Sequence, residues 1–389
     1  MPDVDRDYDL VLLGATGFTG RLVAEDLTRE LGPSGLRWAI AGRDRTRLEA
    51  VREDLAAISP DATPDGLEVV DVHDRPALTD LARRTRVIAT TVGPYARHGE
   101  DVVAACIAAG TDYVDITGEP AFVHRLLRDH HDAAVDAGVR IVNSCGFDSV
   151  PHDLGAQLAV EQLPDDEPVE LRGFVSAKGR FSGGTFTSAI EAMADRDSLR
   201  GPRLDAGPGR RVGSLPRRIQ RVPAIDGWGV PLPTIDPLVV LRSAAALPDY
   251  GPAFRYGHFA RTSNPAVAGG MVAGVGLVAA LAQVGPGRAL LHRLAPDQGE
   301  GPDEATRAEG RFRVTFLGTS PSASTRVEVR GGDPGYTETS KMLAEAARSL
   351  VEDRDALPDR AGVLTTATAF GPVLRERLQA RGITFTVAA

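Results

Sequence analysis

The chain has 389 residues, of which 42% are hydrophobic, and this length and composition predict two domains with substantial cores. Its formal net charge of −9 argues against general nucleic-acid binding. The two cysteines, Cys106 and Cys145, are too far apart to indicate a disulfide framework or a zinc motif, so no metal site is predicted. The acidic, polar start, MPDVDRDYD, does not resemble a signal peptide, and we expect a cytoplasmic protein.

The first motif, YDLVLLGATGFTG, combines the apolar run of a buried parallel strand with glycines at three-residue spacing and a following helix. In a dinucleotide-binding turn, Gly14 would permit the tight turn, Gly17 the approach of a pyrophosphate, and Gly20 close packing of the helix on the strand. An ordinary strand–turn–helix unit is the alternative. The residues expected to hold the pyrophosphate at the helix N-terminus are Gly14, Thr16, Gly17, Phe18, Thr19 and Gly20.

The second predicted strand, residues 38–41, ends beside the position that distinguishes NAD from NADP. An acidic residue there accepts from the ribose 2′-hydroxyl of NAD, whereas an arginine accommodates the 2′-phosphate of NADP. Arg43 occupies this position. Asp44, the nearby carboxylate, comes one residue late and is placed to cap the next helix, residues 45–58. The sequence therefore predicts NADP(H) as the cofactor.

Strands continue to alternate with helices up to about residue 145. Further strands are predicted at 67–72, 86–92, 113–116 and 139–143, with helices at 76–84, 101–109 and 122–137. This alternation predicts a parallel, doubly wound (Rossmann) sheet in an NADP-binding domain at residues 1–163. Ligands lie outside the carboxyl ends of such strands. The residues expected to contact the cofactor there are Asp71, Val72, Thr91, Val92, Gly93 and Pro94.

Two residues that follow the strand at 139–143 allow more than one interpretation. Asp148 either belongs to the site or caps the next helix, which carries Pro151 in its first turn. Cys145 is interpreted as a small buried hydrophobic residue rather than a nucleophile.

From about residue 164 the alternation stops, which predicts a second, α+β domain at residues 164–354. Its antiparallel sheet is expected from strands at 169–178, 311–318 and 325–330, with helices at 185–194 and 337–350. Residues 201–237, rich in Pro, Gly and Arg, are predicted to be loop within a loop-rich insert at 201–310. The tail, residues 355–389, carries a last helix at 369–381, and we expect it to pack back on the first domain.

Residues 265–284 form an uncharged stretch, PAVAGGMVAGVGLVAALAQV. Its length is near the span of about 20 residues that crosses a membrane, and Gly270 and Gly274 stand four apart, as in close-packed helix pairs. Alanine and glycine dominate it, so its drive into lipid is low. The alternatives are a buried helix, a homodimer interface, an acyl-chain tunnel, or peripheral contact with a membrane or lipid.

Five motifs in order resemble the saccharopine dehydrogenase-like oxidoreductases, and more narrowly the trans-acting enoyl reductases of actinobacterial polyketide-lipid pathways: GATGFTG, AIAGRD, TTVGPYARHGE, DYVDITGE and NSCGFDSVPHDLG. The resemblance continues through KGRFSGGT, GDPGYTET and GVLTTATAFGPVL, and it is weakest over about 200–310. It implies an NADP-binding Rossmann domain, a second domain closing over it, and reduction of a carbon–carbon double bond on a carrier-bound acyl chain. It carries the glycine motif onto Gly14, Gly17 and Gly20 and the ribose-phosphate position onto Arg43, and it assigns no acid or base.

Enoyl reduction needs a hydride on the β-carbon, a proton on the α-carbon, and stabilisation of charge on the thioester oxygen. We predict two catalytic residues: Tyr95, which follows the turn nearest the expected nicotinamide, and Lys178. Of the 44 basic residues two are lysine, which leaves 42 arginines, and only a lysine readily changes its pKa. Two rival functions are a saccharopine dehydrogenase-like C–N oxidoreductase on an amino-acid substrate and a non-catalytic NADPH-binding protein associated with lipid.

Overall fold

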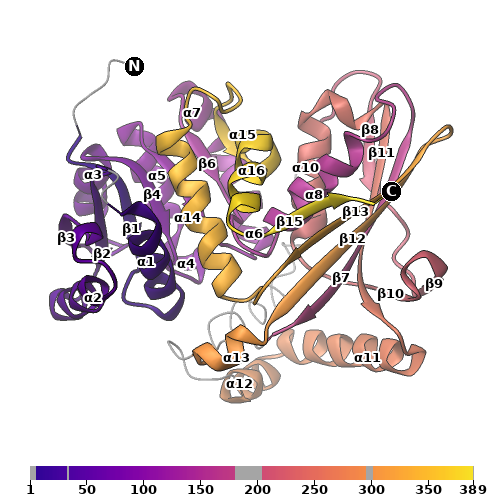
Figure 1. The fold of residues 1–389 in the computed structure, drawn as a ribbon, viewed down its shortest axis with the longest axis horizontal. Helices are drawn as coiled ribbons and strands as arrows, with labels where there is room; N and C mark the ends of the chain where they lie inside the picture. The colour runs from indigo at the N-terminus through magenta and orange to yellow at the C-terminus, as the bar shows by residue number, and fades with distance from the viewer. Residues whose placement is uncertain (1–5, 33–34, 180–203, 295–300, 389) are drawn as a thin grey trace.

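The computed structural model describes residues 6–32, 35–179, 204–294 and 301–388. Within these residues it contains two β-sheets that lie side by side in Figure 1. The first sheet has seven strands in the order β14-β6-β5-β4-β1-β2-β3. The second has eight, in the order β15-β13-β12-β7-β11-β10-β9, with β8 paired to β11.

The first sheet is parallel throughout, which confirms the predicted Rossmann architecture. Its strands are β1 (Tyr8–Leu13), β2 (Trp38–Gly42), β3 (Gly66–Val69), β4 (Thr85–Thr90), β5 (Asp112–Asp115), β6 (Arg140–Val142) and β14 (Gly362–Leu364). The helices that follow them are α1 (Phe18–Leu31), α2 (Arg45–Ile58), α3 (Arg75–Arg83), α4 (Tyr95–His98), α5 (Glu100–Ala109), α6 (Pro120–Asp129), α7 (His131–Asp136) and α8 (Val150–Val160). The single helix predicted at 122–137 is thus two helices, and the strand predicted at 67–72 ends at Val69.

The second sheet is mixed, because β12 runs antiparallel to β7 and β13 whereas β11 runs parallel to β7 and β8. Its strands are β7 (Val169–Lys178), β8 (Arg211–Ser214), β9 (Gln220–Val222), β10 (Gly227–Pro231), β11 (Ala253–Thr262), β12 (Arg311–Thr319), β13 (Ser324–Gly331) and β15 (Thr384–Val387). The helices of this half are α10 (Asp236–Ala246), α11 (Pro265–Ala282), α12 (Gly285–Leu294), α13 (Glu304–Ala308), α14 (Thr337–Glu352), α15 (Thr366–Phe370) and α16 (Pro372–Ala380).

The loop-rich segment and the tail of the second half differ from their predicted structure. The prediction of loop at 201–237 was wrong, because three short strands, β8, β9 and β10, lie there and complete the edge of the second sheet. The helix predicted at 185–194 lies outside the described residues. The tail divides between the two sheets: β14 pairs with β6, β15 pairs with β13, and the predicted last helix is interrupted at Gly371.

The two halves share one hydrophobic core. Because successive side chains of a strand point to opposite faces, Leu10 and Leu12 of β1 belong to one core and Val11 and Leu13 to another. The first of these cores continues without a break into the second sheet, where it includes Phe316. Helix α14 packs on β1, β4 and β5 and stands between the two sheets in Figure 1. Helix α14 and the shared core therefore join the first sheet to the second half.

Candidate functional site

The glycine turn between β1 and α1 has the backbone that a pyrophosphate site requires. Gly14 has a φ of +94°, a conformation that residues with a side chain rarely adopt. A Cβ at Gly20 would lie 2.1 Å from the Gly14 carbonyl oxygen, so only glycine lets α1 pack this closely on the turn. Gly17 is the N-cap of α1, and no side chain caps the helix there. The free N–H groups of the first helical turn thus fit a bound phosphate.

The other residues predicted around the turn contribute in different ways. The Thr91 hydroxyl donates to the Gly14 carbonyl oxygen at 3.3 Å, and Thr16 lies beside Gly42 at the end of β2. The Phe18 side chain points away into the second half, because its ring meets Tyr336 edge to face with the centroids 5.0 Å apart. Phe18 therefore offers a ligand its backbone N–H group rather than its ring.

The residues predicted farther along the edge lie beside the strands that they follow. Asp71 accepts a hydrogen bond from the His73 backbone N–H at 2.9 Å, and Val72 is buried. The Val92 backbone N–H donates to the Thr90 hydroxyl at 3.2 Å, and the peptide bond between Gly93 and Pro94 is cis.

Arg43 and Asp44, at the end of β2, have different roles. The Asp44 carboxylate accepts the backbone N–H of Arg47 at 3.1 Å and so serves as the N-cap of α2. The Arg43 side chain is exposed at the carboxyl edge of the sheet. An arginine rather than an acid is thus available to the ribose at this position, as NADP requires.

Tyr95 lies in the core beneath the turn that it follows. Its hydroxyl donates to the Thr90 carbonyl oxygen at 3.1 Å, and burial raises its pKa well above the usual 10. The Glu119 carboxylate accepts the backbone N–H groups of Tyr95 and Ala96, both at 2.9 Å, and so fixes the start of α4. The phenol is therefore committed to an internal hydrogen bond.

Lys178 lies at the far end of β7, on the surface. Its side chain is 55% exposed and its ammonium contacts the Glu309 carboxylate at 2.8 Å. The contacts of Lys178 and Tyr95 have no residue in common, so the structure does not bring the two predicted catalytic residues together.

The loop after β6 presents Asp148 at the carboxyl edge of the sheet. Asp148 does not cap α8, because Ser149 is the N-cap, and Ser149 has an unusual φ of 133°. The Asp148 side chain is exposed, and no described residue donates a hydrogen bond to its carboxylate. A Cβ at Gly118, in the loop after β5, would lie 3.3 Å from Oδ2 of Asp148. The carboxylate therefore lies beside the β5 loop and is open to a ligand.

The surroundings of this exposed carboxylate favour its protonated form. Desolvation by the protein around it, and then the negative charge of Asp236, raise the pKa of Asp148 to about 6, whereas His152 lowers it. The loop itself is held by Asp115, which accepts hydrogen bonds from Thr117, Ser144, Asn143 and Tyr113. Asp148 is thus a carboxyl group with a raised pKa on a loop that Asp115 holds in place.

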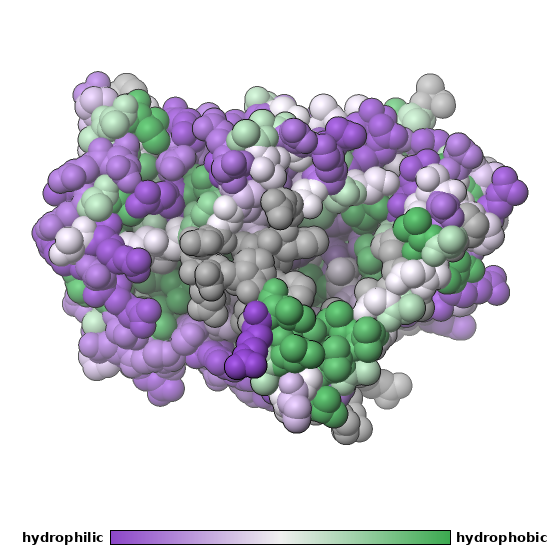
Figure 2. All heavy atoms as spheres, turned by 90° about the horizontal axis from the view of Figure 1, so that it is seen from below, coloured by the Kyte–Doolittle hydropathy of each residue, from purple (hydrophilic) through white to green (hydrophobic). Residues whose placement is uncertain are grey.

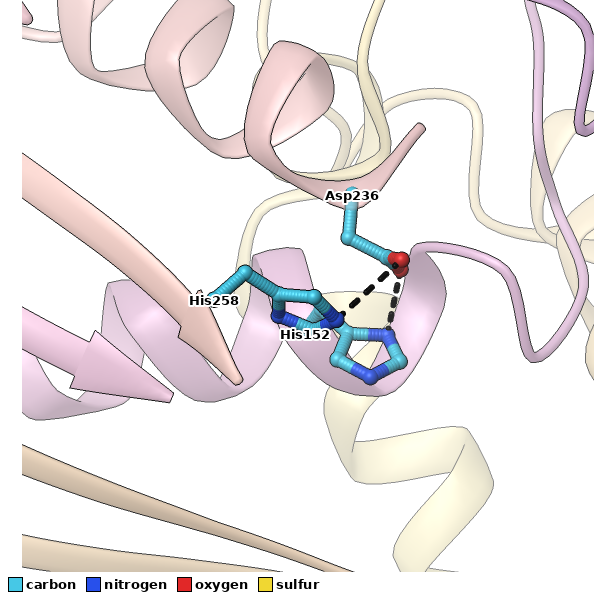
Figure 3. A group of neighbouring side chains, drawn as sticks. All are labelled: His152, Asp236 and His258. Carbon is cyan, nitrogen blue, oxygen red and sulfur yellow. Dashed lines mark ion pairs between the residues drawn. The ribbon is translucent and has the colours of Figure 1, made fainter. Parts of the chain in front are cut away.

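Behind Asp148, three buried side chains from separate elements meet (Figure 3). Figure 3 shows His152 of α8 and His258 of β11 directed at Asp236, the first residue of α10. Nδ1 of His152 lies 2.8 Å from one carboxylate oxygen, and Nε2 of His258 lies 3.4 Å from the other. Burial alone would raise the pKa of Asp236, but the two imidazoles hold it well below its usual range. Burial lowers the pKa of His258 to about 4.

This cluster also meets one requirement of a metal site. Among the described residues, only His152, Asp236 and His258 place three ligand atoms within 4.8 Å of one another. The 2.8 Å contact is shorter than the separation of about 3.3 Å between ligands that lie about 2 Å from one tetrahedral zinc ion. Direct contact of the carboxylate with the two imidazoles therefore describes the cluster better. The cluster was not predicted from the sequence, because its three residues share no motif.

The uncharged stretch forms α11, which pairs with α12 at the surface, and Figure 2 shows apolar side chains gathered on this face. The large exposed apolar residues there are Val267, Leu277, Val284, Leu290 and Leu294, between 48% and 69% exposed. A Cβ at Gly270 or Gly274 would meet no atom within 4 Å. No helix in the described part of the chain combines the length and apolarity needed to span a membrane.

The chain is similar to known proteins along its whole length. Residues 10–142 match the family model of the saccharopine dehydrogenase NADP-binding domain. A Mycobacterium tuberculosis protein provisionally named a trans-acting enoyl reductase is 38% identical, and the trans-acting enoyl reductase of Mycobacterium ulcerans is 34% identical, each over 98% of both chains. The saccharopine dehydrogenase (L-Glu forming) of Saccharomyces cerevisiae matches with a TM-score of 0.53 and 15% identity, covering 98% of this chain and 99% of that one, which shows the fold alone.

Proposed function

Because the chain belongs to the saccharopine dehydrogenase-like oxidoreductases, in the branch of the trans-acting enoyl reductases, we propose that it reduces the carbon–carbon double bond of a carrier-bound enoyl chain. The observation that carries this proposal is the likeness over 98% of the chain to relatives that bear that name. Membership of this family makes the protein an NADP-dependent oxidoreductase; the enoyl substrate is the proposed part.

Each part of the proposed reaction has a candidate group at the carboxyl edge of the first sheet. Bound NADPH would supply the hydride that reaches the β-carbon. The glycine turn would hold its pyrophosphate, and Arg43 would hold its ribose phosphate. A proton must then reach the α-carbon, and in such sheets the reacting end of the coenzyme is expected near the loops that follow β4, β5 and β6.

We assign the proton donor to Asp148. A general acid must reach the substrate and must hold a proton at the working pH. The Asp148 carboxyl is open beside Gly118, and its pKa is raised to about 6. The Tyr95 hydroxyl already donates to Thr90 within the core, and Lys178 pairs with Glu309 at the surface. Asp148 therefore combines access from the carboxyl edge of the sheet with a raised pKa, whereas Tyr95 is buried and Lys178 lies at the far end of β7.

A lipid-like substrate or partner is consistent with the surface of α11 and α12. A cluster of exposed apolar side chains on one face is typical of a site of contact with lipid or with another protein. Contact of residues 265–284 with an acyl chain, a membrane surface or a second copy stays a prediction.

The proposal is tested by following NADPH oxidation with a crotonyl thioester, presented on coenzyme A and on an acyl carrier protein. We expect a butyryl thioester by mass spectrometry, with deuterium on the β-carbon when the NADPH carries it as the transferred hydride. An imine formed from an amino acid and a keto acid is the matched substrate for the rival C–N chemistry. Turnover of the imine, with none of either thioester, would overturn the proposal.

A further inference from the structure

Two histidines form a pair at the edge that also carries Arg43; His98 belongs to the TTVGPYARHGE motif, and His73 lies outside the quoted motifs. His73 follows β3 and His98 ends α4, so both stand at the carboxyl edge of the first sheet. Nε2 of His73 lies 2.9 Å from Nδ1 of His98, and the ring centroids are 5.0 Å apart. His73 is exposed and His98 is half-buried, so a ligand at this edge can reach the pair.

Positive groups crowd around this pair. Burial lowers the pKa of His98, and the nearby His73, Arg97 and Arg43 lower it further, in that order. Asp71 acts in the opposite direction on His98, and Asp101 lies 4.0 Å from His73 while it also pairs with Arg75. The positive charges of Arg97 and Arg43 therefore act on the pair at this edge, where the ends of β2 and β3 adjoin because the Val70 backbone N–H donates to the Gly42 carbonyl oxygen at 3.0 Å. Such crowding is relieved when an anion binds among the groups.

We propose that His98 and His73, together with Arg43, bind the 2′-phosphate of NADP(H), and that binding of this phosphate is coupled to the uptake of a proton by the histidine pair. The inference rests on the cofactor and is independent of the enoyl substrate. Arg43 alone was expected to recognise the phosphate; the histidine pair joins the segments that follow β3 and β4 and would contact the phosphate from another side.

The coupling follows from the proton that the two rings share. In the free protein one ring nitrogen of the pair donates to the other. The accepting nitrogen carries no proton, so at least one of the two rings is neutral. A phosphate dianion binds the pair best when one added proton makes one ring imidazolium, because one of the two facing nitrogens must remain an acceptor. Binding of the dianion therefore raises the pKa of His98, and affinity for NADPH should fall as pH rises through neutrality. NADH lacks the phosphate, so its affinity should not change with pH in this way.

The experiment is isothermal titration calorimetry of the full chain at about pH 7.5, where the coenzyme phosphate, with a second pKa of about 6, is already a dianion. Titrations of NADPH and NADH in two buffers with different ionisation enthalpies give the number of protons taken up. We expect uptake with NADPH and none with NADH. His98→Asn and His73→Asn should abolish the uptake and weaken NADPH binding by about 10- to 100-fold, as loss of a charged hydrogen bond does.

The controls keep the proposal falsifiable. Affinity for NADH should stay unchanged in both variants, which shows that the fold and the glycine turn are intact. His130→Asn, which replaces a histidine bonded to Glu100 away from this edge, should bind both coenzymes like the parent. Equal proton uptake with NADPH and NADH, or an unchanged ratio of their affinities in His98→Asn, would overturn the proposal whether or not the protein reduces enoyl thioesters.

Discussion

The glycine turn and the cluster of His152, Asp236 and His258 are two sites of the same molecule that are encoded in opposite ways. The turn is one contiguous stretch, and each of its glycines is explained by the backbone within that stretch. The cluster draws its members from a helix of the first half, the start of α10 and a strand of the second sheet. A site made by local backbone geometry is visible in a sequence, whereas a site made by side chains depends on how distant elements pack.

The sharpest test of the local site is Gly17→Val. A Cβ at Gly17 would meet only the Gly14 carbonyl oxygen, at 3.4 Å, which is ordinary van der Waals contact. The chain should therefore fold, while the added side chain occupies the space of the pyrophosphate. We expect no measurable binding of NADPH in a fluorescence titration and an unchanged thermal midpoint.

Two further glycine variants separate binding from folding. Gly20→Val should lower the yield of folded protein, because its Cβ would lie 2.1 Å from the Gly14 carbonyl oxygen. Gly213→Val places the same side chain where a Cβ meets nothing within 4 Å, so it should behave like the parent. Normal NADPH affinity in folded Gly17→Val would show that the turn is not the phosphate site.

Asp148→Asn tests whether the loop between β6 and α8 supplies the proton. Loss of a general acid typically lowers turnover by about 100- to 10,000-fold. Because the pKa of Asp148 is about 6 and the acid acts in its protonated form, turnover of the parent should fall as pH rises above that value. The turnover of the variant should not show this fall with pH, and the variant should bind NADPH normally.

The control for this variant is Asp166→Asn, an exposed carboxylate just before β7. It should keep the turnover and the pH profile of the parent. If Asp148→Asn reduces a crotonyl thioester as fast as the parent does, the donor is another group or a bound water.

The same contrast explains which parts of the structure could be predicted. The bounds of α2 and β7 match the prediction to the residue, because Asp44 caps α2 and a long alternating run ends at Lys178. Strands β8 to β10 were missed, since they are short, rich in Arg, Pro and Gly, and depend on pairing with β11 or with each other. The role of Asp148 could not be chosen from the sequence, because it depends on Gly118 and Asp236, which are distant in the chain.

Asp236→Asn tests the site made by distant elements, and its effect should appear in stability. Asp236 is the buried partner of both imidazoles, and leaving a buried polar group without its partner typically costs about 1–3 kcal/mol. The folded-state pKa of Asp236 is depressed, so its contribution is fully present above the unfolded pKa of about 3.9 and is lost as pH falls below it. The difference in free energy of unfolding from the parent, measured in urea, should therefore hold at neutral pH and shrink in acid.

The matched control for stability is Asp249→Asn, which alters an exposed carboxylate between α10 and β11. It should unfold at the urea concentration of the parent. An Asp236→Asn protein of parental stability would mean that contact of this carboxylate with the two imidazoles does not stabilise the fold.

The smallest expected effect is that of Lys178→Met. The sequence predicted that this lysine donates a hydrogen bond to the developing enolate oxygen. Removal of one such donor typically lowers turnover by about 100- to 1,000-fold. The structure places its ammonium in water, 55% exposed and paired with a Glu309 side chain that is 72% exposed. Exposed ion pairs contribute little, because solvent screens them and side-chain entropy opposes them. We therefore expect turnover, NADPH affinity and thermal midpoint close to those of the parent, and the same for Glu309→Gln.

A large loss of turnover confined to Lys178→Met, with NADPH affinity intact, would instead require the surface at the end of β7 to approach the substrate during the reaction. Lys178 would then be the hydrogen-bond donor to the enolate oxygen, as its position in the sequence predicted.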